Sequence, residues 1–183
     1  MKKLLALLCT LFCLLSLAQN QVDPWNTYQW NKKNVKANNG LIDKSFWFEW
    51  WYYKITIPNT GKSYFFVYGI VNPWDLLGQH HSSRAYITMG DFHQKLQFEN
   101  TYDVSSFKAS YENTHIEIAQ NYATDREFKG QLRNSQSQTL VQWDVAIKKQ
   151  WSFNAQGWLL GSGITDIDWY PAQASATCSG TII

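Results

Sequence analysis

One carboxylate, Glu49, lies inside the aromatic run Phe46–Tyr53. Because alternate residues of a β-strand share a face, a strand here would place Glu49 between Trp47 and Trp51. A carboxyl group between indole rings is desolvated, and desolvation raises its pKa by disfavouring the charged form. Such a group can hold a proton near neutral pH and deliver it to a substrate. Glu49 is therefore a candidate general acid; the alternative is a structural carboxyl bonded to a Tyr hydroxyl, a Trp N–H or Lys54.

The residues around Glu49 indicate which face of this strand is buried. The face with Glu49 ends in Ile55 and Ile57, which favour a core, whereas the opposite face ends in Lys54 and Thr56, which favour solvent. We therefore expect the Glu49 face to point inward. The two faces are Trp47, Glu49, Trp51, Tyr53, Ile55 and Ile57 on one side and Phe46, Phe48, Trp50, Tyr52, Lys54 and Thr56 on the other.

Three other sets of residues could do chemistry, and each has a plainer interpretation. His80 and His81 would need further ligands to bind a metal, so we expect a solvated or rim-lining loop. Asp166 and Asp168 are spaced for one strand face and could serve paired-carboxylate chemistry, but we expect them to face water near a rim. Cys178 is expected to be a small core residue rather than a nucleophile. We predict no metal and no cofactor.

The elements that would position these residues are short strands separated by turns, without helical periodicity of useful length. Residues 46–57, a turn at 58–61 and residues 64–71 predict a β-hairpin. Gly90-Asp91 and Glu112-Asn113 are expected turns. Further strands are expected at 84–89, 94–99, 107–111, 115–119, 127–132, 140–147, 163–169 and 174–182. Their regular spacing predicts an all-β meander that closes into a barrel or sandwich.

The first 18 residues have the pattern of a secretory signal peptide. Lys2 and Lys3 precede the apolar run Leu4–Leu15, and small residues at Ser16 and Ala18 mark a cleavage site. The apolar run is also shorter than the roughly 20 residues that a membrane-spanning helix needs. We expect an exported protein, periplasmic or secreted and bacterial, with no transmembrane segment in the mature chain.

The mature chain would be electrically neutral. Removing residues 1–18 leaves equal numbers of basic and acidic side chains, so neither a nucleic acid nor an anionic membrane has electrostatic support as a partner. Only Cys178 remains, which excludes an intramolecular disulfide and argues against a cysteine-based zinc site. We expect residues 19–44 to form an irregular N-terminal arm and residues 45–183 to form a single domain stabilised by its core.

The predicted hairpin resembles the opening hairpin of the tocopherol cyclase family. That family has a Phe-Glu-Gly-Trp-Tyr-Phe-Lys strand, a turn, and an aromatic strand that ends in Tyr-Gly/Ser-x-x-Asn-Pro. Here Phe48–Ile55 and Ser63–Pro73 match it, the resemblance covers residues 46–91, and a fainter one lies at 169–180. Trp50 replaces the family's Gly, and this version is similar to the carotenoid 1,2-hydratase (hydroxyneurosporene synthase) group.

The resemblance implies a lipocalin-like antiparallel β-barrel or a strongly curved meander. Both families are longer, with two such barrels, so we expect this sequence to cover about the first half of such a protein. The end of the sequence within the apolar residues 181–183 agrees with that expectation.

The resemblance also implies a hydrophobic prenylated ligand. Tocopherol cyclases protonate an isoprenoid double bond and a hydroquinone oxygen then attacks the cation, whereas carotenoid hydratases add water. Either reaction needs an apolar pocket, an acid and aromatic faces that stabilise a cation. The residues expected to act are Glu49 as the acid and Trp47, Trp51, Tyr53, Phe66 and Tyr68 as the ligand-binding side chains. The alternative is a lipocalin-like carrier without catalysis.

Overall fold

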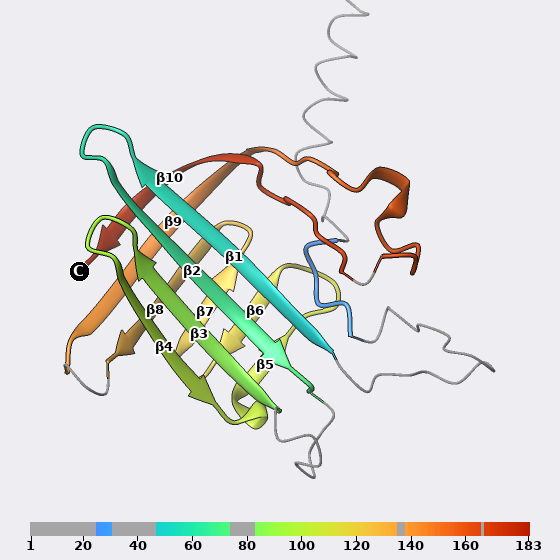
Figure 1. Ribbon diagram of the computed structural model, residues 1–183, viewed down its shortest axis with the longest axis horizontal. Helices are drawn as coiled ribbons and strands as arrows, with labels where there is room; N and C mark the ends of the chain where they lie inside the picture. Colours follow the sequence, from blue (N-terminus) through green and yellow to red (C-terminus); the bar gives the residue numbers. More distant parts are fainter. Residues whose placement is uncertain (1–24, 31–46, 74–82, 135–137, 166) are drawn as a thin grey trace, which may run out of the picture.

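The computed structural model describes residues 25–30, 47–73, 83–134, 138–165 and 167–183. These residues form two antiparallel β-sheets that face each other (Figure 1), so the predicted all-β fold is confirmed. The predicted signal peptide, most of the predicted arm at 19–44, and His80 and His81 lie outside the described residues. Within the described ranges, no helix has the length and apolar character to cross a bilayer.

The first sheet is a four-stranded meander in chain order. Its strands are β1 (Phe48–Ile57), β2 (Lys62–Val71), β3 (Arg84–Asp91) and β4 (Leu96–Tyr102). β1 and β2 pair without a register shift, from Phe48 opposite Val71 to Ile57 opposite Lys62, so the predicted hairpin is confirmed. Its turn contains Gly61 at a φ of +65°, a conformation that glycine adopts without strain.

The second sheet is six-stranded, in the order β10-β9-β8-β7-β6-β5. Its strands are β5 (Phe107–Ala109), β6 (His115–Ile118), β7 (Asn121–Thr124), β8 (Glu127–Arg133), β9 (Leu140–Trp151) and β10 (Ser175–Ile182). Of the predicted strands, 163–169 is wrong, because its described residues form bends and irregular backbone. β7 was not predicted, since four residues with Asn at their start carry a weak strand signal.

The space between the two sheets is filled by large apolar side chains. Phe66 and Tyr68 of β2 are fully buried there, and the ring of Phe66 packs against Phe128 and Trp143 at centroid distances of 5.0 and 4.9 Å. The hydroxyl group of Tyr68 accepts a hydrogen bond from Trp143 Nε1 at 2.9 Å and donates one to the carbonyl of Lys129 at 3.2 Å. The space between the two sheets is therefore filled by side chains around Phe66 and Tyr68.

The predicted turn at Gly90-Asp91 is also wrong, because β3 continues through both residues and the turn follows at 92–95. Gly90 has a packing role: a Cβ atom there would collide with the ring of Phe65 on the neighbouring strand. A glycine in a strand can mark such a close approach rather than a turn.

The sheets do not close into a complete barrel within the described residues. β1 is the edge of the first sheet and β10 is the edge of the second, and β1 pairs with β2 and β10 with β9 (Figure 1). The expected barrel or curved meander is therefore an open, curved arrangement, and the edge strand that carries Glu49 remains accessible from one side.

Candidate functional site

A cleft of about 1,530 Å³ lies between the two edge strands. One wall is β1, of which every residue from Phe48 to Thr56 borders the cleft. The opposite wall combines the start of β10 with residues 160–163, 165 and 167–174 of the loop that precedes it. Trp25, Asn26 and Gln29 border the Glu49 end. This volume exceeds the roughly 300–1,000 Å³ of common small-molecule pockets, because side chains from both faces of β1 border the cleft and it is open along that edge.

The alternation of β1 determines which side chains turn toward the interior. Trp51 and Ile55 are buried and Tyr53 is half-buried, whereas Tyr52, Lys54 and Thr56 are exposed. The predicted inward face is confirmed for these residues. Ile57 is exposed instead, because it is the last residue before the hairpin turn.

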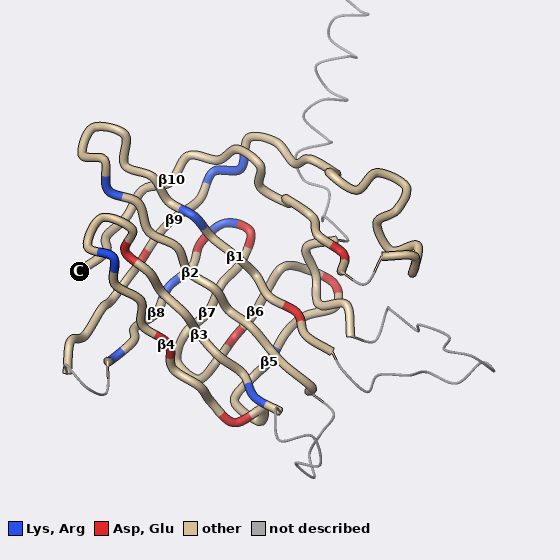
Figure 2. The backbone as a smooth tube through the Cα atoms, in the orientation of Figure 1, with Lys and Arg blue, Asp and Glu red and all other residues tan. Residues whose placement is uncertain are grey.

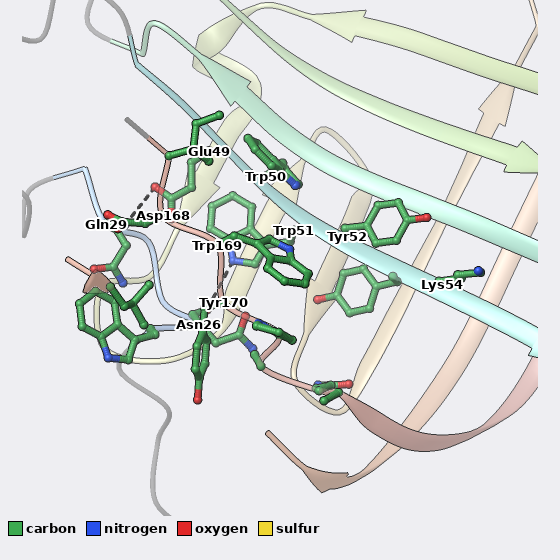
Figure 3. Close-up of a pocket in the computed structure, with 18 of the residues that line it drawn as sticks. Asn26, Gln29, Glu49, Trp50, Trp51, Tyr52, Lys54, Asp168, Trp169 and Tyr170 are labelled. Carbon is green, nitrogen blue, oxygen red and sulfur yellow. Dashed lines mark hydrogen bonds between the residues drawn. The ribbon is translucent and has the colours of Figure 1, made fainter. Parts of the chain in front are cut away.

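Glu49 is half-buried and its carboxylate faces the N-terminal segment. The backbone N–H of Gln29 donates to both carboxylate oxygens, at 3.1 Å each (Figure 3). A donor shared by both oxygens stabilises the charged form of a carboxyl group. This partner lies twenty residues away in the chain and is a backbone group, so no pattern of side chains indicated it.

Tyrosine hydroxyl groups lie within electrostatic range of Glu49. Burial raises the pKa of Tyr28 well above its ordinary range, and the charges of Tyr111 and Glu49 raise it further. Burial, and then the Glu49 charge, likewise raise the pKa of Tyr111. Both hydroxyl groups therefore stay protonated near neutral pH and can act as hydrogen-bond donors.

A cluster of aromatic rings connects residues 25–30 to the strand at this end of the cleft. Tyr28 stacks on Tyr111 at 5.0 Å, meets Phe107 edge-on at 5.3 Å and lies 6.2 Å from the ring of Trp51. The indole N–H of Trp51 donates to the carbonyl of Asn26 at 3.4 Å (Figure 3). The segment 25–30 is thus attached to β1 by both rings and hydrogen bonds.

Trp47 meets the ring of Trp30 edge-on, with 5.4 Å between the ring centroids. Its indole Nε1 is buried, and no acceptor for it is found among the described residues. Asn72 positions Trp47 at the start of β1: its Oδ1 accepts from the Trp47 N–H at 2.9 Å, and its own N–H donates to the Trp47 carbonyl at 2.7 Å. The Asn72-Pro73 end of the family-like hairpin therefore fixes the strand next to Glu49.

The predicted site residues fall into two groups. Trp47, Glu49, Trp51 and Tyr53 border the cleft. Phe66 and Tyr68 are fully buried between the sheets and are not among the residues that border it. A role of these two side chains in ligand binding stays a prediction, whereas their packing in the core is observed.

One wall of the cleft carried no signal that the sequence alone could reveal as part of a site. Asp168, expected to face water near a rim, borders the cleft, and its Oδ1 accepts from the N–H of Gly161 at 2.9 Å and from the hydroxyl of Thr165 at 3.3 Å. Asp166 lies outside the described residues. Cys178 is exposed and borders the cleft, so its predicted place in the core is wrong: an edge strand has one side without a neighbour.

A signal for the other missed contacts was present in the N-terminal segment. Trp25, Tyr28 and Trp30 lie in a polar stretch for which the sequence predicts an irregular arm. Aromatic residues in a polar stretch usually pack somewhere, and here Tyr28 is buried against β1.

These features define a class: an all-β protein of two curved antiparallel sheets with an aromatic, ligand-sized cleft along an edge strand. Within that class the chain belongs to the tocopherol cyclase-like family, whose model matches residues 44–151. No curated protein and no solved structure gives a match. The family supports a cyclase-like function in general terms. The matched part includes β1 to β9 and ends before the loop and β10 that complete the cleft.

Proposed function

We propose that the cleft binds a hydrophobic prenylated molecule and that Glu49 protonates an isoprenoid double bond of it, which leads to ring closure of a prenyl quinol. One observation carries the proposal. Of the described residues that border the cleft, Glu49 is the only acidic side chain within the part of the chain that matches the family. It lies on a strand whose neighbouring side chains are aromatic.

The proposed reaction is an isomerisation. The acid form of Glu49 gives its proton to one carbon of the double bond, which leaves a tertiary cation on the other carbon. The hydroquinone oxygen attacks this cation, forms a C–O bond and loses its own proton to the Glu49 carboxylate. No electrons are exchanged with a cofactor. The faces of Trp47 and Trp51, on the same side of β1, would stabilise the cation.

Ligand entry would control the protonation of Glu49. In the ligand-free protein the Gln29 N–H stabilises the carboxylate. An apolar ligand displaces water from the cleft, and the loss of water favours the neutral acid. The acid would therefore form next to the double bond that it protonates.

The test is turnover of a prenylated hydroquinone in D₂O. The mechanism places one deuterium on carbon in the chromanol product, which mass spectrometry detects. Glu49→Gln should lower the rate by about 10²-fold or more, the usual effect of removing a general acid. Glu49→Gln should still bind the ligand, and quenching of tryptophan fluorescence measures this binding. Glu112→Gln, an exposed acid in the bend between β5 and β6, is the matched control and should keep full activity. Full activity of Glu49→Gln would exclude the mechanism.

The carrier alternative has one observation in its favour. Both oxygens of Glu49 accept from the Gln29 N–H, and this arrangement also suits a purely structural carboxylate. A carrier would quench its tryptophan fluorescence on binding and return the ligand chemically unchanged. A product heavier by one water molecule would instead identify a hydratase.

A further inference from the structure

The segment from Trp151 to Trp169 exposes an unusual number of large apolar side chains. We call this segment the arm; it is distinct from the N-terminal residues 19–44. Trp158 is 77% exposed and Ile164 is 68% exposed. The whole set of exposed large apolar side chains on the arm is Trp151, Phe153, Trp158, Ile164, Ile167 and Trp169. Such a concentration on one segment is the usual sign of an interaction surface.

The arm extends away from the two sheets beside the cleft (Figure 1). Its inner side is anchored there: Leu160 is buried, and Gly161 packs so closely under the ring of Trp25 that a Cβ atom would collide with it. Residues 160–165 and 167–169 also border the cleft, apart from Ile164. One segment thus provides a wall of the cleft and an apolar outer surface.

Several polar groups of the described part of the arm are hydrogen-bonded within it. Asn154 accepts from the Gly157 N–H at 2.8 Å and donates to the Gly157 carbonyl at 3.1 Å. Gln156 donates to the Ile167 carbonyl at 2.9 Å and accepts from the Trp169 N–H at 2.7 Å.

The same holds for the rest of the loop, where Asp168 accepts from Gly161 and the Ser162 hydroxyl donates to the Leu159 carbonyl at 2.7 Å. Internal pairing of these polar groups lowers the cost of placing the loop, with its apolar side chains outward, at the boundary between water and a bilayer.

The charges on and near the arm indicate which kind of membrane surface it suits. Residues 151–183 contain no Lys, Arg, His or Glu, and two Lys, at 148 and 149, immediately precede the arm and are exposed. Figure 2 shows no basic residue along the described part of the arm. Trp side chains favour the boundary between lipid headgroups and acyl chains, and the exposed Lys148 next to the arm can reach phosphate groups. The acidic side chains of the arm are Asp166 and Asp168, and Asp168 is hydrogen-bonded within the arm. An apolar surface without basic residues therefore suits a zwitterionic phospholipid surface better than an anionic one.

We propose that the arm docks on the surface of a phospholipid bilayer, with Trp158 and Ile164 inserted at its boundary. Docking would place the cleft next to the bilayer, from which an apolar ligand could enter. This last step rests on the proposed function, whereas the docking itself does not.

The test is flotation of the full, ligand-free protein with phosphatidylcholine vesicles. The double variant Trp158→Ser/Ile164→Ser should lower the partition coefficient at least tenfold. Its fold, followed by circular dichroism, should not change, because both side chains are exposed. The matched control is Phe92→Ser/Leu96→Ser, which removes two exposed apolar side chains at the β3–β4 turn and should bind within twofold of the wild type.

Apolar insertion should also persist at about 1 M salt, where charges are screened beyond about 3 Å. Three results would overturn the proposal: no vesicle binding by the wild type, equal binding by the arm variant, or release at high salt. A wild-type dimer that the arm variant converts to a monomer would overturn it too, because a second copy would then cover the arm. All these results are independent of the Glu49→Gln assay, so either proposal can fail alone.

Discussion

Tyr68 connects the two sheets through its hydroxyl group, and Tyr68→Phe removes only that oxygen. In the wild type the oxygen accepts from Trp143 Nε1 at 2.9 Å and donates to the Lys129 carbonyl at 3.2 Å. Tyr68 is fully buried and Trp143 is 2% exposed, so water cannot replace the lost partner. The variant therefore leaves a buried indole N–H without an acceptor.

The expected loss of stability follows from these two bonds. A buried donor left without a partner costs about 1–3 kcal/mol, and loss of the second bond adds about 0.5–1.5 kcal/mol. We expect the free energy of unfolding to fall by about 1.5–4.5 kcal/mol. With a urea dependence of about 2 kcal/mol per molar, the unfolding midpoint would fall by about 1–2 M.

A urea titration followed by circular dichroism measures this shift. Tyr52→Phe, which alters an exposed hydroxyl on β1, is the control and should leave the midpoint unchanged. Adding Trp143→Phe to Tyr68→Phe should cost less than the sum of the single changes, because both partners of one bond are then absent. An unchanged midpoint in Tyr68→Phe, combined with loss of ligand binding, would refute the structural role and make Tyr68 a binding residue.

Two further predictions concern the start of β1 and the response to alkaline pH. Asn72→Ala should lower the free energy of unfolding by about 2–3 kcal/mol, because it removes the acceptor of the Trp47 N–H and requires alanine at a φ of 45°. Asn72→Asp keeps an acceptor and should lose less stability. Equal losses in the two variants would contradict this account. Burial, and then the charge of Asp125, raise the pKa of Tyr53 above its ordinary value of 10.0. Because the folded state holds this proton more tightly, its contribution to stability is present below about pH 10 and is lost as pH rises further. Urea titrations between about pH 8 and 12 should show a shallower alkaline loss in Tyr53→Phe than in the wild type, and equal slopes would argue against the buried hydroxyl.

The sequence alone predicted the features that depend on local pattern. Alternation along residues 47–57 predicted the strand and its inward face, and the turn chemistry at 58–61 predicted the hairpin. Both rest on neighbours within a few residues, which one chain displays directly. Alternation also predicted a strand at 163–169, and this prediction is wrong: Ile164 and Trp169 have no neighbouring strand and are exposed on a loop.

Tertiary structure decided what each of these side chains does. Glu49 receives its hydrogen bond from the backbone of Gln29. Tyr68 is hydrogen-bonded to Lys129 and Trp143, which lie 61 and 75 positions further along the chain. None of these partners can be inferred from spacing. The cleft itself exists because the edges of two sheets, β1 and β10, border one space while a loop closes one side. The sequence determined that Glu49 lies on the inward face of an aromatic strand. Only the packing of distant segments decided that β1 borders an open cleft at Glu49, whereas Tyr68 of β2 lies in a filled core. Burial depends on which elements come together in three dimensions.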